Sequence, residues 1–350
     1  MRIDPTIDFA PAREVSPEIL EEFYRSAFPS RGNYLVKNWK WHYGGADLAN
    51  LKNWPLLALS PCGKIVGHVA TIPTNFSIGQ GAVETRWFVD YFVAPSAREQ
   101  GIGGELIRRV MQAAPLMLAI GVSKYSLPIF RSHGWFEIAG TMRLSKVLRL
   151  RNFQSVRQSR LKSGVCDGID WCLGGFVEHI GTIFGIEGLT ERVSSSPSDL
   201  LLEANSNNKA VALEWRSWAR KSLEWWLDDS QIGGQFFLHT MGNEYALSRM
   251  FRSDCNLELS LLAVSENCGP SMFLYLLRWG IANDIARLSL VTNNGNLQSS
   301  TRKCLFSRKP LPPFYFSRDQ AIRSAILSAP PNWQMIDSDL DLALPDVSVA

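Results

Sequence analysis

The sequence has no C-x-x-C pair and no run of about 18 consecutive apolar residues, the length that a membrane-spanning helix needs. Its six cysteines are scattered, so we predict neither a zinc site nor a disulfide framework, and a reduced, cytoplasmic setting is the simplest interpretation. The first residues, MRIDPTIDFAPAREV, contain no apolar core of signal-peptide length. We therefore expect a protein without a membrane segment.

Charge of either sign is also limited. The net charge of +3 is too small to favour a nucleic-acid surface, and the basic stretch at 143–162 is interpreted as a solvated connector. Hydrophobic residues make up 46% of the chain and charged residues 20%, which is typical of a globular protein. A length of 350 residues favours two domains, at about 100–200 residues for each.

The first half of the chain has the pattern of two helices followed by a meander of strands. Apolar residues at helical spacing predict the helices. Three apolar or aromatic stretches joined by short turns then predict antiparallel strands. After them the pattern alternates between helix and strand. The expected elements are helices at 16–28 and 34–44, strands at 54–60, 65–78 and 84–93, a helix at 102–114, a strand at 116–122, a helix at 123–134 and a strand at 135–148.

The second half repeats this course. Residues 236–264 again read as three strands joined by turns, followed by a helix at 270–284 and a strand at 286–292. The polar, proline-containing stretch at 194–199 marks a boundary. We interpret the second half as a divergent tandem copy of the first. The expected organisation is a first domain at 1–150, a connector at 151–195, a second domain at 196–334 and a tail at 335–350.

The stretch VAPSAREQGIGGEL at 93–106 places three glycines between a predicted strand and a predicted helix. Backbone N–H groups at a helix N-terminus have no partner within the helix and bind anions. Glycine allows a positive φ and lets a phosphate approach the backbone closely. No GK[ST] follows the glycines, which excludes a P-loop, and the antiparallel strands before them disfavour a dinucleotide-binding βαβ unit. The turn is therefore a candidate phosphate site.

The same stretch fits the motif V-x-P-x-x-R-x-x-G-x-G, which resembles that of the GNAT superfamily of acyl-CoA-dependent N-acyltransferases. Its fixed positions are Val93, Pro95, Arg98, Gly101 and Gly103. A second signature of that superfamily appears at 130–135 as FRSHGW. The resemblance covers roughly residues 16–150 and implies an α/β chain with the GNAT fold, a mixed, mostly antiparallel sheet flanked by helices, in two tandem units. The second copy is degenerate, because SENCGP stands in place of the glycine turn at 265–270.

The resemblance implies a site for acetyl-CoA or another acyl-CoA as co-substrate. The strand before the turn would bind the pantetheine arm through its backbone, and the turn would bind the diphosphate. Ser123 matches a position that often contacts pantetheine, and Phe130 stands where relatives carry a tyrosine near the thiol. The expected cofactor-binding residues are Tyr91, Phe92, Val93, Arg98, Glu99, Gln100, Gly101, Ile102, Gly103, Gly104, Ser123 and Phe130.

The chemistry implied by the resemblance is attack of a neutral amine on a thioester, with a backbone N–H at Phe92–Val93 to stabilise the oxyanion. The chain departs from its relatives, because Phe130 cannot donate a proton and Leu118 replaces a glutamate that some of them carry. Asp90 is the candidate catalytic residue, as the base that accepts the amine proton directly or through water. The alternative is a structural carboxylate bonded to a loop amide.

Other polar side chains are weaker candidates. His68 could face the acceptor or be a structural histidine, and Tyr125 could replace the missing tyrosine only if its helix ran differently. His133 suits the dipole at a helix end, and Glu84 suits a solvated strand start. The stretch NWKWHYGG at 38–45 could wall the acceptor site or simply pack on the sheet.

These observations predict an enzyme, an N-acyltransferase that moves an acetyl or other acyl group from CoA to the amine of a small molecule. No nucleic acid, membrane or metal is an expected partner, and the sequence does not indicate an oligomeric state. The second copy is expected to hold no cofactor. Two alternatives stay open: a carrier-protein- or aminoacyl-tRNA-dependent transferase, and a non-catalytic acyl-CoA-binding module.

Overall fold

The structure, a computed structural model, describes residues 6–29, 31–45, 48–78, 81–149, 190–193, 224–225, 227, 234–253 and 256–329. The chain forms two compact units, each built on one seven-stranded sheet. The first unit comprises Met1–Ala139, Glu214–Trp226 and Pro312–Pro331, and the second comprises Gly140–Leu213, Leu227–Leu311 and Asn332–Ala350. The expected tail, and the expected connector except for 190–193, lie outside the described residues.

The first unit follows the expected order of helices and strands, preceded by one additional short strand. Its strands are β1 (Asp8–Pro11), β2 (Leu56–Leu59), β3 (Ile65–Ile78), β4 (Gly81–Val93), β5 (Leu116–Ala119), β6 (Phe136–Glu137) and β14 (Phe314–Ser317). Its helices are α1 (Pro17–Ala27), α2 (Gly32–Gly44), α3 (Ile102–Val110), α4 (Leu127–Ser132) and α12 (Gln320–Ser328), with 3₁₀ turns at Ala12–Glu14, Ala49–Lys52 and Pro95–Ala97.

The strand order of the first sheet is β1-β2-β3-β4-β5-β14-β6. The predicted antiparallel meander is confirmed, since β3 pairs in antiparallel fashion with both β2 and β4. β4 and β5 are parallel, and their pairing covers only Thr85–Trp87 and Leu116–Leu118. In the described pairing, the end of β4 beyond Trp87 therefore has no partner strand on the β5 side, which leaves backbone groups available to another molecule.

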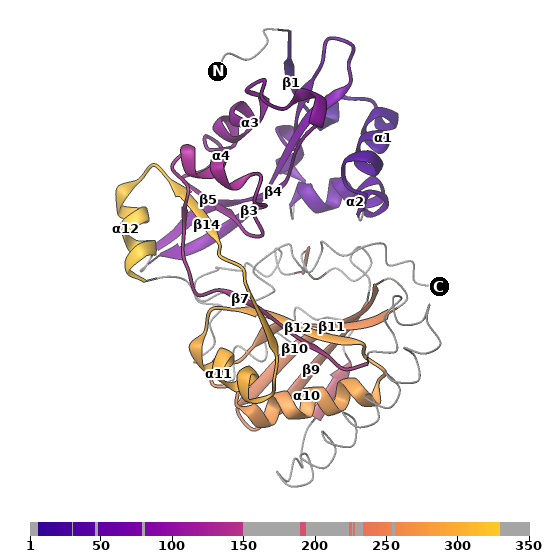
Figure 1. Ribbon diagram of the computed structural model, residues 1–350, viewed down its shortest axis with the longest axis vertical. Coiled ribbons are helices and arrows are strands. Elements are labelled where there is room, and N and C mark those ends of the chain that lie inside the picture. Colours follow the sequence, from indigo (N-terminus) through magenta and orange to yellow (C-terminus); the bar gives the residue numbers. More distant parts are fainter. Residues whose placement is uncertain are drawn as a thin grey trace. The chain divides into compact units, whose positions relative to one another are not determined.

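Helices cover both faces of this sheet, with α1 and α2 on one side and α3 and α4 on the other (Figure 1). In α3 the apolar residues recur at helical spacing and are buried; they are Ile102, Leu106, Ile107 and Val110. The helix predicted at 102–114 ends instead at Val110. The helix predicted at 123–134 begins only at Leu127, because Pro128 suits the first turn of a helix.

The second sheet has the order β13-β7-β12-β11-β10-β9-β8. The three predicted strands in 236–264 are confirmed as the antiparallel β9, β10 and β11, and the predicted helix and strand after them as α10 and the parallel β12. The elements are β7 (Met142–Val147), β8 (Thr190–Val193), β9 (Gln235–Met241), β10 (Glu244–Ser253), β11 (Asn256–Val264), α10 (Pro270–Ala282), β12 (Arg287–Thr292), α11 (Gly295–Lys303) and β13 (Ser307–Pro310).

Two strands are exchanged between the halves of the sequence. β7 pairs with β12 and β13 in the second sheet, whereas β14, near the end of the chain, pairs with β5 and β6 in the first. The single strand predicted at 135–148 is wrong, since it is broken into β6 and β7 near Gly140, whose φ is 106°. The units are consequently not contiguous in sequence, unlike the expected domains at 1–150 and 196–334.

The α/β class with mixed, mostly antiparallel sheets flanked by helices is confirmed. A short segment from the second half of the chain also joins the first unit. The indole N–H of Trp225 donates to the carbonyl of Trp41 in α2 at 3.2 Å, and the two rings lie 5.7 Å apart. Among the described residues, the helices are all too short or too polar to cross a membrane.

Candidate active site

A pocket of about 410 Å³ lies where β4 ends and α3 begins. Four segments form its wall: the end of β4, the turn after it, the first turn of α3 and the stretch that leads into α4. Seven of the twelve residues expected at a cofactor site therefore share one hollow. The lining residues are Tyr91, Phe92, Val93, Ala97, Arg98, Glu99, Gly103, Ser123, Tyr125, Ser126 and Ile129.

The glycine turn has the left-handed backbone that its sequence suggests. Gly101, the N-cap of α3, has a φ of 80°, and Glu99 also lies in the left-handed region with a φ of 66°. No side chain caps α3 at Gly101, and the first N–H groups of a helix have no partner within it. Arg98 is exposed beside them and adds positive charge. The turn can therefore hold an anion such as a diphosphate.

The hydroxyl of Tyr91 lies against the first turn of α3. A Cβ atom at Gly103 would overlap Oη of Tyr91, so this close approach requires glycine. Within the described part of the chain, Tyr91 Oη is buried and has no hydrogen-bond partner. Burial raises the pKa of Tyr91 to about 12, so the phenol is a neutral donor in the pocket wall.

Four expected cofactor residues contribute no side chain to the pocket. The side chain of Ile102 is buried in the core, and that of Gln100 is exposed and donates to a carbonyl of the preceding turn at 3.1 Å. Gly101 and Gly104 offer only backbone. Their N–H groups, like those of Gln100 and Ile102, lie around the start of α3, so a role in anion binding stays a prediction for them.

Phe130 is not among the residues that line the pocket, so its expected contact with the cofactor stays a prediction. Its ring is only 1% exposed and packs against Phe88, Trp135 and Phe314, with centroid distances of 5.0, 4.7 and 6.1 Å. An apolar ring is stable in such a core, whereas the hydroxyl of a tyrosine would need a partner there. The side chain at this position therefore belongs to the fold.

β4 carries a β-bulge beside the pocket. Asp90 has a φ of 52°, and the register between β3 and β4 shifts between His68 and Ala70. Such an extra residue bends a strand and redirects its backbone groups. A left-handed conformation at a non-glycine residue costs about 1–3 kcal/mol, so the surroundings must hold Asp90 in place.

The Asp90 carboxylate lies at the centre of a buried polar cluster. It accepts a hydrogen bond from the Tyr43 hydroxyl at 2.6 Å, and it lies 3.2 Å from the Arg31 guanidinium and 3.6 Å from Nε2 of His42. Burial by itself would raise the pKa of Asp90, but the Arg31 guanidinium, together with the hydrogen bond from Tyr43, outweighs it and holds this pKa well below its ordinary value. Asp90 is therefore a poor proton acceptor, and its surroundings favour the structural alternative over the role of base.

Hydrogen-bond partners define the proton positions on two histidines of this cluster. A guanidinium only donates, so Nη2 of Arg31 donates to Nε2 of His42 at 3.0 Å, and the proton of His42 is on Nδ1. A carbonyl only accepts, so Nδ1 of His68 donates to the carbonyl of Asp90 at 2.6 Å. Burial lowers the pKa of both histidines, that of His68 to about 4, and both are therefore neutral at pH 7.

An aromatic shell covers His68. The rings of Phe23, Tyr24, Phe28 and Tyr43 lie between 5.5 and 5.9 Å from its ring, and His68 is completely buried. His68 is thus a structural histidine in its contacts. Two members of this cluster, His42 and Tyr43, belong to the stretch NWKWHYGG that the sequence analysis singled out, but no local pattern indicates their partner Asp90.

The surroundings of the remaining sequence candidates, Tyr125, Glu84 and His133, do not indicate a catalytic role. Tyr125 is 79% exposed at the rim of the pocket, and Glu84 is exposed. Nδ1 of His133 lies 2.9 Å from the carbonyl of Ile129 at the end of α4. Among the residues that the structure describes, no group of three or more His, Cys, Asp or Glu side chains is arranged to hold a metal ion.

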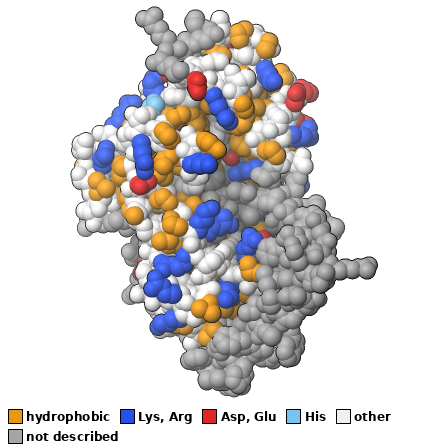
Figure 2. Space-filling model, in the orientation of Figure 1, with side chains coloured by type: hydrophobic (Ala, Val, Ile, Leu, Met, Phe, Trp, Pro, Cys, Tyr) orange, Lys and Arg blue, Asp and Glu red, His pale blue; other side chains and the backbone are white. Residues whose placement is uncertain are grey.

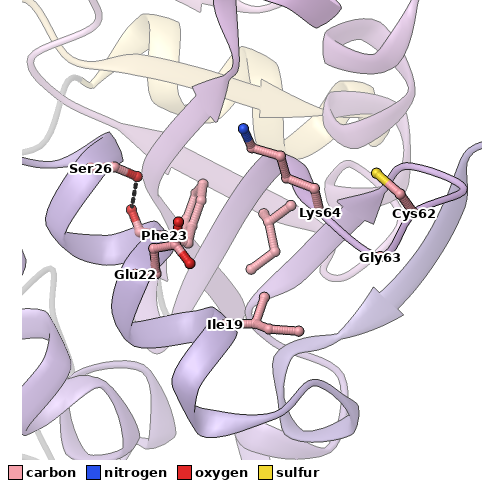
Figure 3. Close-up of a pocket in the computed structure, with 8 residues that line it drawn as sticks. Ile19, Glu22, Phe23, Ser26, Cys62, Gly63 and Lys64 are labelled. Carbon is pink, nitrogen blue, oxygen red and sulfur yellow. Dashed lines mark hydrogen bonds between the residues drawn. The ribbon is translucent and has the colours of Figure 1, made fainter.

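A second hollow of about 290 Å³ lies between α1 and the turn that joins β2 to β3 (Figure 3). Glu22 projects from the helix and Lys64 from the turn, and Phe23 belongs both to this wall and to the aromatic shell around His68. The exposed Cys62 thiol has a lowered pKa because of its hydrogen bond with a serine hydroxyl. The lining residues are Ile19, Glu22, Phe23, Ser26, Cys62, Gly63, Lys64 and Ile65.

The second unit differs at the corresponding helix. α10 begins at Pro270, which has no N–H to offer, and a Cβ atom at its N-cap Gly269 would lie 3.3 Å from the carboxylate of Glu244. Burial, and then Glu244, raise the pKa of the neighbouring Cys268 thiol well above its ordinary value. A carboxylate at this place opposes the binding of a phosphate.

Comparisons with known proteins agree with this geometry. Residues 17–134 match the model of the acetyltransferase (GNAT) family. A GCN5-related N-acetyltransferase from Kribbella flavida is similar in structure, with 13% sequence identity and a TM-score of 0.53 over 90% of this chain and 71% of that chain. A putative acetyltransferase from Pyrococcus horikoshii shares 12% identity and gives a TM-score of 0.52 over 91% of this chain and 92% of its own.

At such identities the likeness concerns the fold, and it extends over most of both chains. No curated protein matches the sequence. The family match, by contrast, covers the segment that carries the glycine turn and the pocket. The similarity of this chain to the acetyltransferase (GNAT) family therefore lies in residues 17–134, the segment that carries the candidate site.

Proposed function

We propose that the first unit is an N-acyltransferase that takes an acetyl or other acyl group from acyl-CoA and transfers it to an amine of a small molecule. The observation that carries this proposal is the pocket at the start of α3, where seven residues expected at the cofactor site lie together. The family match supports acyl transfer in general.

The residues present fit the chemistry of an acyl-CoA. The N–H groups at the start of α3 and the charge of Arg98 suit the diphosphate, and Gly103 leaves the space that a side chain would fill. The hydroxyl of Tyr91 is a buried donor that lacks a partner among the described residues, and Ser123 offers a second hydroxyl in the wall. The backbone of β4 beyond Trp87 suits the amides of the pantetheine arm.

In the proposed reaction, the amine nitrogen forms a bond to the thioester carbonyl carbon and the C–S bond breaks. The CoA sulfur leaves with the electron pair and takes up a proton, while the amine nitrogen loses one. Since the carboxylate of Asp90 is held in an ion pair, the amine proton passes to water. The backbone of β4 stabilises the negative charge on the carbonyl oxygen.

A second candidate is an acyl-CoA-binding module without catalysis. It is favoured by the buried ring of Phe130, which cannot supply a proton, and by the ion-paired state of Asp90. Transfer from an aminoacyl-tRNA is less favoured. On the face drawn in Figure 2, the Lys and Arg side chains of the described residues are interspersed with hydrophobic and uncharged ones rather than forming one continuous stripe.

The test is calorimetric titration with acetyl-CoA and longer acyl-CoAs, followed by a thiol-release screen against pooled amines. The proposal expects saturable acyl-CoA binding and amine-dependent release of free CoA. Binding without release over the whole panel would favour the module. A protein that binds no acyl-CoA but retains charged aminoacyl-tRNA on a filter would contradict the proposal.

A further inference from the structure

The peptide group between Asp90 and Tyr91 lies at the bulge of β4 and is held from β3. Nδ1 of His68, on β3, donates to its carbonyl oxygen at 2.6 Å. Across a trans peptide group, the N–H points in the opposite direction from the C=O. The bond from His68 therefore turns the N–H of Tyr91 away from β3.

The hydrogen-bond ladder between β3 and β4 gives the same direction for the N–H of Tyr91. The N–H of Ala94 donates to the carbonyl of Val66 on β3 at 2.9 Å, and the register stays regular from there to His68. In an antiparallel ladder, alternate residues direct their N–H groups to the same neighbour. Tyr91 and Val93 thus direct theirs to the other side of β4, where β5 lies.

On that side the backbone of β4 has separated from β5, because the described pairing of these strands ends at Trp87. Tyr91 and Val93 line the pocket at the same place. An N–H that points here meets whatever group occupies the pocket beside β4.

Resting on the proposed function, we infer that His68 is a positioning residue for acyl transfer. Its Nδ1–H fixes the carbonyl of Asp90 and thereby holds the N–H of Tyr91 toward the pocket, where this N–H donates to the thioester carbonyl and to the oxyanion formed from it. Arg31 and Tyr43 hold the side chain of the same aspartate. The strained bulge residue is thus fixed at both its carbonyl and its carboxylate.

Two other roles agree less well with the geometry. The sequence favoured the N–H groups of Phe92 and Val93 as oxyanion donors. The N–H of Phe92, however, points toward β3, because successive N–H groups along β4 alternate between its two neighbours. Nε2 of His68 carries a lone pair, but His68 is completely buried under the aromatic shell and lines neither hollow. An amine in the pocket does not reach it, so the Nδ1 side is the one that acts.

Three substitutions separate these roles. His68→Asn places an amide near the position of Nδ1, His68→Gln places one near Nε2, and His68→Phe keeps a ring without either nitrogen. His239→Phe, in the second unit, removes another completely buried histidine and is the matched control. Each variant is titrated with acetyl-CoA by calorimetry. The infrared C=O stretch of bound acetyl-CoA, labelled with carbon-13 at the thioester, reports on hydrogen bonding to that carbonyl. Thiol release with hydroxylamine as acceptor gives kcat and KM.

We expect His68→Phe to lower kcat by about 10- to 100-fold, because the donor is misplaced rather than removed. Its Kd and KM for acetyl-CoA should stay within about twofold of the wild-type values, because the diphosphate contacts are intact. The C=O stretch should return toward that of free acetyl-CoA. His68→Asn should show most of the wild-type kcat and most of the wild-type shift in the C=O stretch, whereas His68→Gln should show neither. His239→Phe should leave both the kcat and the C=O stretch unchanged.

An unchanged rate and stretch in His68→Phe would overturn the positioning role, and so would rescue by Gln rather than Asn or failure of a folded His68→Asn variant. If His68→Phe does not fold, the comparison of Asn with Gln decides alone. Wild-type protein that binds no acetyl-CoA would overturn the proposed function and the inference with it. Binding with an unshifted stretch in the wild-type protein would overturn only the role of His68.

Discussion

The guanidinium of Arg31 lies 3.2 Å from the carboxylate of Asp90, and their side chains are only 10% and 6% exposed. Arg31 is the residue before α2, and Asp90 is the bulge residue of β4. The pair thus ties the start of a helix to the strained point of the strand that borders the pocket. Since both charges are buried, their attraction offsets part of the cost of removing them from water.

Replacing Asp90 with Asn should destabilise the first unit by about 3–5 kcal/mol, because it breaks a buried ion pair by removing one of its charges. Arg31→Met combined with Asp90→Asn should cost clearly less than the two single changes together. Urea unfolding of the four proteins measures this. Strictly additive losses would show that the pair does not interact.

The same Asp90→Asn variant also tests the base hypothesis. A carboxylate with a pKa well below its ordinary value does not give an acidic limb near neutral pH in the rate profile. We expect whatever activity the folded variant retains to keep the wild-type dependence on pH. Loss of a titrating limb would restore Asp90 as the proton acceptor.

Gly103→Ala should weaken CoA binding by about tenfold or more, equivalent to about 1.4 kcal/mol, because the new Cβ overlaps Oη of Tyr91 at the start of α3. Adding Tyr91→Phe removes this oxygen and should recover part of the affinity. Gly295→Ala is the control, since a Cβ there meets nothing within 4 Å. Calorimetry measures all three, and full affinity in Gly103→Ala would place the diphosphate elsewhere.

Acidification should destabilise the protein in the window between pH 6.5 and 4. The pKa of His68 is about 4 in the folded protein against an ordinary 6.5, so the unfolded chain binds more protons in this window and is favoured as pH falls. The contribution of His68 is fully present above pH 6.5 and lost toward pH 4. His68→Asn should therefore flatten the dependence of the urea midpoint on pH. Parallel curves for the two proteins would contradict the buried, neutral state of His68.

One CoA should bind per chain. The start of α10 combines Pro270, which lacks an N–H, with the nearby carboxylate of Glu244, and both oppose a phosphate. The stoichiometry from calorimetry checks this prediction. Two equivalents of CoA bound per chain would mean that the second unit carries a CoA site of its own.

A fragment that ends at residue 150 should not fold stably. It lacks β14, whose residues Phe314, Tyr315 and Phe316 are buried in the first sheet between β5 and β6. Each such side chain contributes about 1.5–3 kcal/mol by burial, and the bare edge of β5 would invite aggregation. A fragment with residues 312–329 rejoined by a linker should recover a cooperative thermal transition. Equal thermal transitions for the fragments with and without residues 312–329 would argue against the pairing of β14 with the first sheet.

Much of the first unit was predictable from short-range patterns. The meander of β2, β3 and β4 follows from apolar and β-branched stretches separated by turns, and α3 follows from a helical repeat that begins at Ile102. The pocket wall was also predictable to the extent that it comes from one continuous stretch, Tyr91–Gly103, together with Ser123.

The polar cluster around Asp90 was not predictable. Its members come from the α1–α2 connection, α2, β3 and β4, and nothing local in the sequence pairs Arg31 with a residue on the fourth strand. The value of Asp90 as a base depended on its pKa, and this pKa is set by groups far away in the chain.

By itself, the sequence determined that residues 93–106 form a strand end, a left-handed turn and a helix start suited to an anion, because φ preferences and apolar periodicity act over a few residues. Only the tertiary structure decided that Asp90 is an ion-pair partner, that Phe130 belongs to the core and that β7 and β14 lie in exchanged sheets. Burial, charge pairing and strand order arise from contacts between distant segments, and no local pattern records them.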